Sequence, residues 1–94
     1  MNEEDLKKRT KQFGLRVIKL VEALPNTTTA RTIGHQLLRS GMSVGANYRA
    51  ACRGRSKAEF VAKTGISLEE AENVFIGWNY CKKQRLSLLN GSKK

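Results

Sequence analysis

The chain has 94 residues, with 18 Lys or Arg against 8 Asp or Glu, and a formal net charge of +10. Because domains usually take about 100–200 residues, we expect one domain over residues 1–94, which excludes a large multi-domain enzyme. No apolar run exceeds three residues and the N-terminus lacks the order of a signal peptide, so we expect a cytoplasmic protein that makes no membrane contact.

The first predicted element is an amphipathic helix over residues 4–24. Its apolar side chains recur at steps of three, four or seven, which places them on one side of a helix. Acidic residues 3–5 lie at the positive end of its dipole, and Pro25 ends it.

A second helix is predicted over residues 28–52, after the candidate N-caps of residues 26–29. Gly41 and Gly45 are four residues apart and make one side of it smooth, so another backbone can approach closely. We expect Gly54 to end this helix in the left-handed conformation. A polar row follows the apolar side, and the resemblance described below favours a structural polar layer formed by Gln36, Arg39, Ser43 and Asn47.

The third predicted helix covers residues 57–89. Ser56 and Glu59 form a capping box, in which the Glu59 carboxylate is expected to reach the N–H of Ser56. No strand-like alternation is present, so the predicted class is all-α, an up-and-down bundle. The apolar ladder of this helix consists of Phe60, Thr64, Leu68, Ala71, Phe75 and Trp78.

No catalytic or metal-binding pattern emerges from the titratable residues. His35 has no second histidine at helical spacing, and Cys52 and Cys81 lack a ligand pattern, so we predict reduced thiols, no metal, no cofactor, no small-molecule substrate and no enzymatic activity. Glu69 and Glu72 share a helix side, and the favoured role is an ion pair of one of them with Arg39 or a contact with Asn47.

The charge is strongly patterned along the chain. Residues 25–63 carry seven basic side chains and one acidic side chain, residues 64–78 carry three acidic ones and no basic one, and residues 79–94 carry five basic ones. Basic segments of this kind indicate a protein that binds polyanions. The alternative is that the charge only keeps exposed helix surfaces soluble. The candidate nucleic-acid-binding residues are Arg49, Arg53, Arg55, Lys57, Lys63, Lys82, Lys83 and Arg85.

The order and spacing of Gln36, Arg39, Ser43, Val44, Ala46 and Asn47 closely resemble those of a known family. It is the four-helix bundle protein family, also described as proteins of intervening sequences in 23S ribosomal RNA genes. It is similar in fold to the accessory proteins of diversity-generating retroelements. The resemblance covers about residues 6–78. Because the pattern of the family does not continue after Trp78, we expect a bundle whose fourth helix is missing or truncated, which would leave an apolar groove exposed.

This resemblance implies a bacterial, non-enzymatic four-helix bundle that assembles as basic homopentameric rings. We therefore expect a homo-oligomeric protein that binds RNA, or an RNA-bound protein, through phosphate contacts. The alternative is a purely structural oligomerisation module, or a truncated family member without retained activity.

Overall fold

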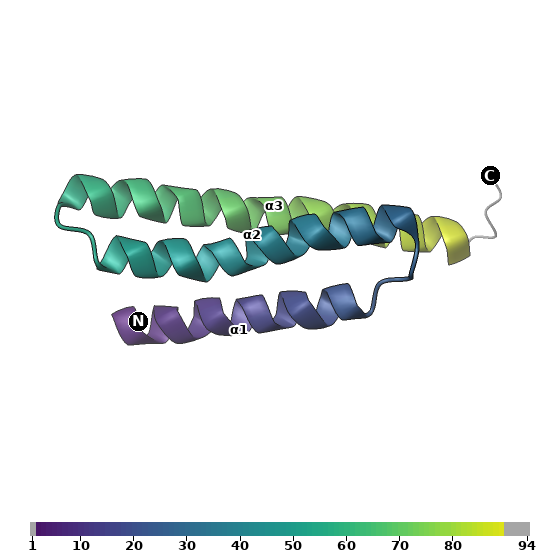
Figure 1. The fold of residues 1–94 in the computed structure, drawn as a ribbon, viewed down its shortest axis with the longest axis horizontal. Coiled ribbons are helices and arrows are strands. Elements are labelled where there is room, and N and C mark those ends of the chain that lie inside the picture. Colours follow the sequence, from purple (N-terminus) through teal and green to yellow (C-terminus); the bar gives the residue numbers. More distant parts are fainter. Residues whose placement is uncertain (1, 90–94) are drawn as a thin grey trace.

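The structure is a computed structural model that describes the backbone of residues 2–89 and the side chains of residues 2–83. It contains the helices α1 (Glu3–Glu22), α2 (Thr28–Cys52) and α3 (Lys57–Leu89), and no strand occurs in this part of the chain. The predicted all-α class is confirmed. The helices run antiparallel in a body of 54 × 22 × 20 Å, and α2 contacts both α1 and α3 (Figure 1). None of the described helices combines the length and hydropathy that a membrane-spanning segment requires.

Local signals at the ends of α1 set its length. The Asn2 side chain accepts a hydrogen bond from the N–H of Asp5 at 2.9 Å, which caps the first turn. The helix ends at Glu22, two residues before the predicted limit. The N–H of Leu24 already bonds the carbonyl of Val21, three residues back, because Pro25 disfavours a helical conformation in the residue before it.

Glycines of α2 allow α1 to pack closely, as their spacing predicts. A Cβ atom on Gly41 would lie 2.9 Å from the Val17 side chain, and one on Gly34 would lie 3.1 Å from Val21. The absence of a side chain at these positions therefore fixes the separation of α1 and α2. In return, Val17 is buried against α2 with 4% of its surface exposed.

The turn between α2 and α3 departs from two expectations. Gly54 does not adopt the left-handed conformation. Its N–H bonds the carbonyl of Ala51 at 3.0 Å, and a Cβ here would lie only 3.1 Å from that oxygen, so lack of space explains the glycine. Ser56 caps the N–H of Glu59 at 3.1 Å as predicted, but the Glu59 carboxylate accepts from the N–H of Arg55 instead of that of Ser56.

The side of α3 that packs on α2 coincides only in part with its apolar ladder, of which Thr64, Ala71 and Trp78 are half-buried. Ser67 and Val74 are buried against α2, whereas Leu68 and Phe75 from the ladder remain exposed. A Cβ on Gly77 would lie 2.7 Å from the Cδ2 atom of Leu37, so this fully buried leucine packs over the glycine. Small residues let α3 approach α2 on this side, and the bulkier Leu68 and Phe75 remain outside the contact.

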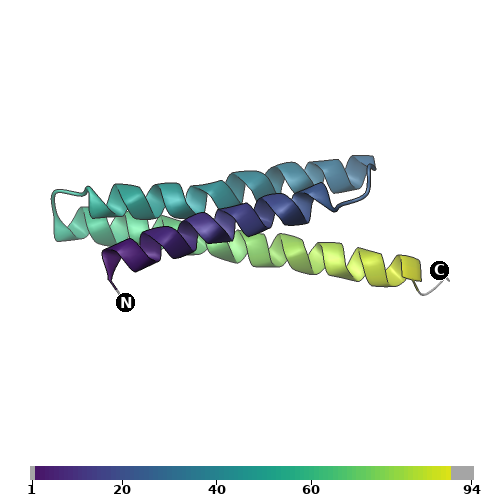
Figure 2. The ribbon, with the colours of Figure 1, turned by 90° about the horizontal axis from the view of Figure 1, so that it is seen from below.

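One buried residue from each helix forms the centre of the core. These residues are Val17 of α1, Leu37 of α2 and Val74 of α3. The partly buried apolar side chains around them are Phe13, Leu20, Val21, Ile33 and Cys81. The core is small, and the last turns of α3 project beyond the α1–α2 connection without a neighbouring helix (Figures 1 and 2).

Candidate functional site

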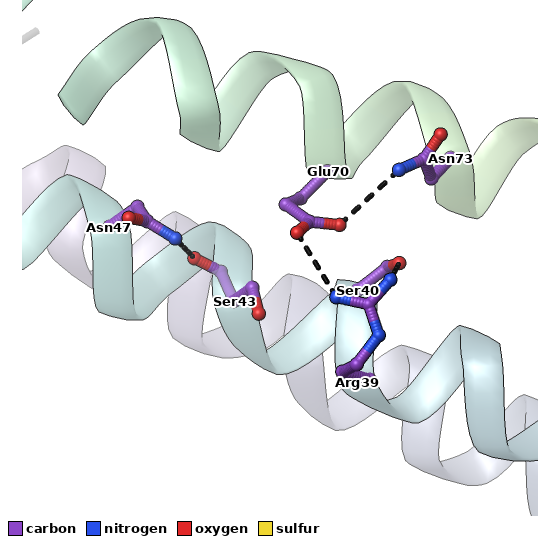
Figure 3. A network of polar contacts seen from close by, with 6 residues as sticks. All are labelled: Arg39, Ser40, Ser43, Asn47, Glu70 and Asn73. Carbon is purple, nitrogen blue, oxygen red and sulfur yellow. Dashed lines mark hydrogen bonds and ion pairs between the residues drawn. The ribbon is translucent and has the colours of Figure 1, made fainter. Parts of the chain in front are cut away.

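The polar contacts between α2 and α3 centre on Glu70. Its Oε2 atom lies 3.3 Å from Nη1 of Arg39, and Asn73 donates a hydrogen bond to its Oε1 atom at 3.4 Å (Figure 3). The predicted ion pair therefore exists, but the assignment to Glu69 or Glu72 is wrong. Both of those side chains are exposed, whereas the side chain of Glu70 retains 16% of its accessible surface.

The pKa of the Glu70 carboxyl reflects opposing effects. Partial burial alone raises the pKa, but hydrogen bonds from Ser40 and Asn73 and the charge of Arg39 outweigh burial and hold the pKa below its ordinary value of 4.5. Glu70 is therefore ionised at neutral pH. Its role is to tie α3 to α2.

The predicted polar row does not form a closed layer. Arg39 reaches α3 while its side chain remains mostly exposed, Asn47 donates within α2 to the carbonyl of Ser43 at 2.9 Å, and Gln36 is exposed. The buried polar contact is instead made by Ser67, whose hydroxyl donates to the Val44 carbonyl at 2.7 Å. Ser67 is a single serine among polar and apolar residues of α3, so no pattern in the sequence predicts its buried hydrogen bond.

The basic residues at the α2–α3 end form the candidate binding surface, here called the turn cluster, which consists of Arg49, Arg53, Arg55, Lys57 and Lys63. All five are exposed, and none makes an ion pair among the described side chains. They come from the last turn of α2, the turn itself and the first two turns of α3. Guanidinium and ammonium groups placed in this way suit phosphate oxygens.

Glu59 is the acidic residue that lies nearest in sequence to the turn cluster, and its side chain makes capping contacts. Its carboxylate accepts from the N–H of Arg55 at 3.1 Å, so it places a negative charge at the positive end of the α3 dipole. A phosphate at this helix end would compete with that carboxylate. The backbone N–H groups at this helix end are therefore less available to an anion than the basic side chains of the turn cluster.

The other predicted basic residues lie at a distance from the turn cluster. Lys82 and Lys83 are exposed. They belong to the last third of α3, which ends at the opposite end of the molecule from the α2–α3 turn (Figure 1). The Lys82 ammonium lies 5.8 Å from the centre of the Trp78 ring. The side chain of Arg85 lies outside the described residues. The predicted set is thus divided between two ends of the bundle.

Packing adds one basic residue that the sequence reading missed. Lys11 of α1 and Arg49 of α2 line the same groove between these helices. Lys11 extends the basic surface around the end of α2. Only the packing of α1 on α2 brings it there, so no local pattern identifies it.

The titratable residues are dispersed, with no metal-binding group among the described side chains. His35 is exposed on α2, and Cys52 and Cys81 are unpaired and half-buried. Burial raises the pKa of the Cys81 thiol. The neighbouring Cys52 side chain, together with burial, raises the pKa of Tyr48 to about 12. Both groups are therefore protonated at neutral pH, and nothing in their surroundings points to catalysis.

Comparisons with known proteins confirm the family resemblance. Residues 2–87 match the family described as 23S rRNA-intervening sequence protein. A protein of unknown function from the S23 ribosomal protein family of Bacteroides thetaiotaomicron is 31% identical, with a TM-score of 0.81 over 89% of this chain and 75% of that one. No curated protein matches. The match over most of the sequence shows that the chain belongs to the 23S rRNA-intervening sequence protein family.

Proposed function

We propose that this protein is a non-catalytic, basic helical module that binds RNA, alone or within a ribonucleoprotein, through contacts to phosphates. The turn cluster carries the proposal, because it gathers five exposed cations with no ion-pair partner among the described side chains. The names of the family and of its relative, which refer to ribosomal RNA and a ribosomal protein family, support RNA as the polyanion.

The surroundings of the turn cluster favour backbone contact over base recognition. Tyr48 is buried with 8% of its surface exposed, so its ring is inaccessible to a base. Phe60 is the partly exposed aromatic ring in the first turn of α3. Stacking of successive bases needs several such rings, whereas phosphate contacts need only the cations.

Substitution of Arg53 and Arg55 tests this function. We expect R53A/R55A to weaken binding to structured RNA and to reduce the slope of log affinity against log salt by about 1.5, since each phosphate contact contributes about 0.7–0.9. Titrations at several salt concentrations measure both quantities. The matched control R16A/K19A removes the same charge from exposed positions of α1. An equal loss in both variants, or no RNA binding by the wild type at low salt, would contradict the proposal.

A structural oligomerisation module is the second candidate, and the exposed ladder of α3 favours it. Leu68 and Phe75 retain 68% and 60% of their surface in the single chain, which is unusual for large apolar side chains that lie close together. In this candidate, self-association covers the ladder, with the homopentamer of the family resemblance as the expected assembly. Sedimentation that detects only the 10.5 kDa chain would contradict it.

A further inference from the structure

The outer surface between α1 and α2 carries a groove of about 350 Å³. Its α2 wall includes Met42 and Ala46. Both lie on the side of α2 away from Val44, whose carbonyl accepts a hydrogen bond from α3. The groove is therefore separate from the α2–α3 interface and from the polar contacts of Glu70.

The two ends of this groove differ in chemistry. The charged residues of its lining are Lys11 and Arg49, which are both basic. Arg49 belongs to the last turn of α2, next to the turn cluster, and Lys11 lies toward the same end because α1 runs antiparallel to α2 (Figure 1). Leu15 and Met42, one from each helix, lie one to two turns further from the turn cluster and retain 53% and 59% of their surface. The groove thus combines cations at one end with accessible apolar walls at the other.

Two glycines of the groove lining, Gly14 and Gly45, are not required by helix packing. A Cβ on Gly14 would lie 3.7 Å from the nearest atom of α2, and one on Gly45 would lie 3.4 Å from the nearest atom of α1, which are ordinary van der Waals distances. Gly41 differs, since a Cβ there would lie 2.9 Å from Val17. Glycine in a helix lowers stability relative to alanine. Packing does not explain this loss at positions 14 and 45, where the missing side chains keep the groove open.

The cations continue from the groove into the turn cluster. Arg53 follows Arg49 by four residues, so it lies on the same side of α2, about 6 Å further along the axis. Lys11, Arg49 and Arg53 are exposed, and none makes an ion pair among the described side chains. A chain of phosphates that contacts the turn cluster therefore meets further cations at the mouth of the groove.

From these features we infer that the α1–α2 groove holds one unpaired base of an RNA whose phosphates contact the turn cluster. The inference rests on the proposed RNA function and deepens it. Lys11 and Arg49 contact the phosphates that flank the unpaired nucleotide, and its base lies between Leu15 and Met42. Apolar side chains can enclose a base that is splayed out of a loop or bulge. The groove volume is at the lower end of the range of about 300–1,000 Å³ for small-ligand sites, so it accommodates one base and not a stack.

The distribution of charge disfavours two other occupants of the groove. A lipid or a free phosphate carries a single anionic group, so it would leave most of the turn cluster unused. An acidic amphipathic helix of a partner protein carries carboxylates along its length, but the lining around Leu15 and Met42 has no charged residue to pair with them. A nucleotide within an RNA chain matches both ends of the groove and the cations beyond it.

Affinities for three RNA hairpins test the inference. The hairpins share one stem, which is fully paired, carries one unpaired adenosine, or carries an abasic residue at the same place. We expect the wild type to bind the hairpin with the unpaired adenosine at least about fivefold more tightly than the other two, since contact with one base contributes such a factor. The abasic hairpin retains the charge and flexibility of the bulge, so equal affinity for it and for the adenosine hairpin overturns the inference.

A variant with a filled groove separates the base contact from the phosphate contacts. A46W places a large side chain in the groove from an exposed position of α2 and leaves the charge unchanged. A23W is the matched control, at an exposed position outside the groove lining. We expect A46W to lose the preference for the unpaired adenosine and A23W to retain it, with circular dichroism to verify that both remain helical. If A46W keeps the preference, the groove serves another ligand, such as a protein helix, and the inference is overturned.

The same titrations distinguish this inference from the proposed function. A wild type that binds all three hairpins equally, and loses affinity in R53A/R55A, refutes the base contact and supports the phosphate contacts. A wild type that binds none of the hairpins at low salt refutes both.

Discussion

Glu70 is the residue with the most defined electrostatic role in the structure. It accepts from groups on both helices, and its pKa lies below 4.5 because these hydrogen bonds and the Arg39 charge outweigh burial. A group whose pKa is lowered by folding stabilises the folded state above its unfolded pKa. That contribution disappears as the pH falls through the lower, folded value.

We expect E70Q to lower the free energy of unfolding at pH 7 by about 0.5–1 kcal/mol, since the partner Arg39 is largely exposed and the pair is screened by water. The difference from the wild type should shrink as the pH falls below about 4.5, where the wild-type carboxyl also becomes neutral. Urea unfolding at several pH values measures it. E69Q is the matched control, and a pH-independent loss, or an equal loss in E69Q, would refute the assigned role.

At the scale of the helix, glycines decide how closely the elements approach. Two glycines of α3 illustrate the difference: a Cβ on Gly65 would meet no atom within 4 Å, whereas one on Gly77 would lie 2.7 Å from Leu37. Leu37 is 1% exposed and has no space in which to move. Glycine therefore only lowers the stability of the helix at position 65, whereas at position 77 it is required for the packing of Leu37.

Alanine substitutions at these two glycines should have opposite effects. G65A is expected to raise the free energy of unfolding by about 0.5–1 kcal/mol, because alanine favours the helix and nothing obstructs it. G77A is expected to lower it by about 1–3 kcal/mol, because the methyl group clashes with Leu37. Thermal or urea unfolding of both variants gives the comparison. Stabilisation by G77A would show that the helices separate at low cost.

The same packing explains what the sequence could predict about the elements. Caps, Pro25 and helical periodicity predict three helices, and the motif around Arg39 and Asn47 predicts the family. Periodicity locates the apolar side of α3 but not the side that its neighbour occupies. The packing side contains Ser67 and Gly77, which have no apolar signature, so the sequence could not predict it.

At the scale of the whole molecule, basic residues distant in sequence gather, while Leu68 and Phe75 of the apolar ladder stay exposed. The packing of α1 on α2 places Lys11 and Arg49 on the lining of one groove. No sequence rule predicts that these two residues lie close together. The sequence nevertheless shows that residues 25–63 are strongly basic, whereas residues 64–78 are acidic. The sequence could therefore predict the sign of the charge on each candidate surface and the segment of the chain that carries it. It could not predict the geometry of these surfaces.

An assembly that covers Leu68 and Phe75, as in the second candidate function, makes stability dependent on concentration. Oligomerisation stabilises the folded chain by mass action, because the unfolded chain has no docking surface. We expect the thermal midpoint of the wild type to rise by several degrees between about 1 and 100 μM protein, since a gain of about 1 kcal/mol shifts the midpoint of a domain this size by about 4–8 °C. Scans of L68S, which should weaken self-association through the ladder, should show a smaller rise. A concentration-independent midpoint in the wild type would mean that the small core formed by Val17, Leu37 and Val74 sustains the fold without a second copy.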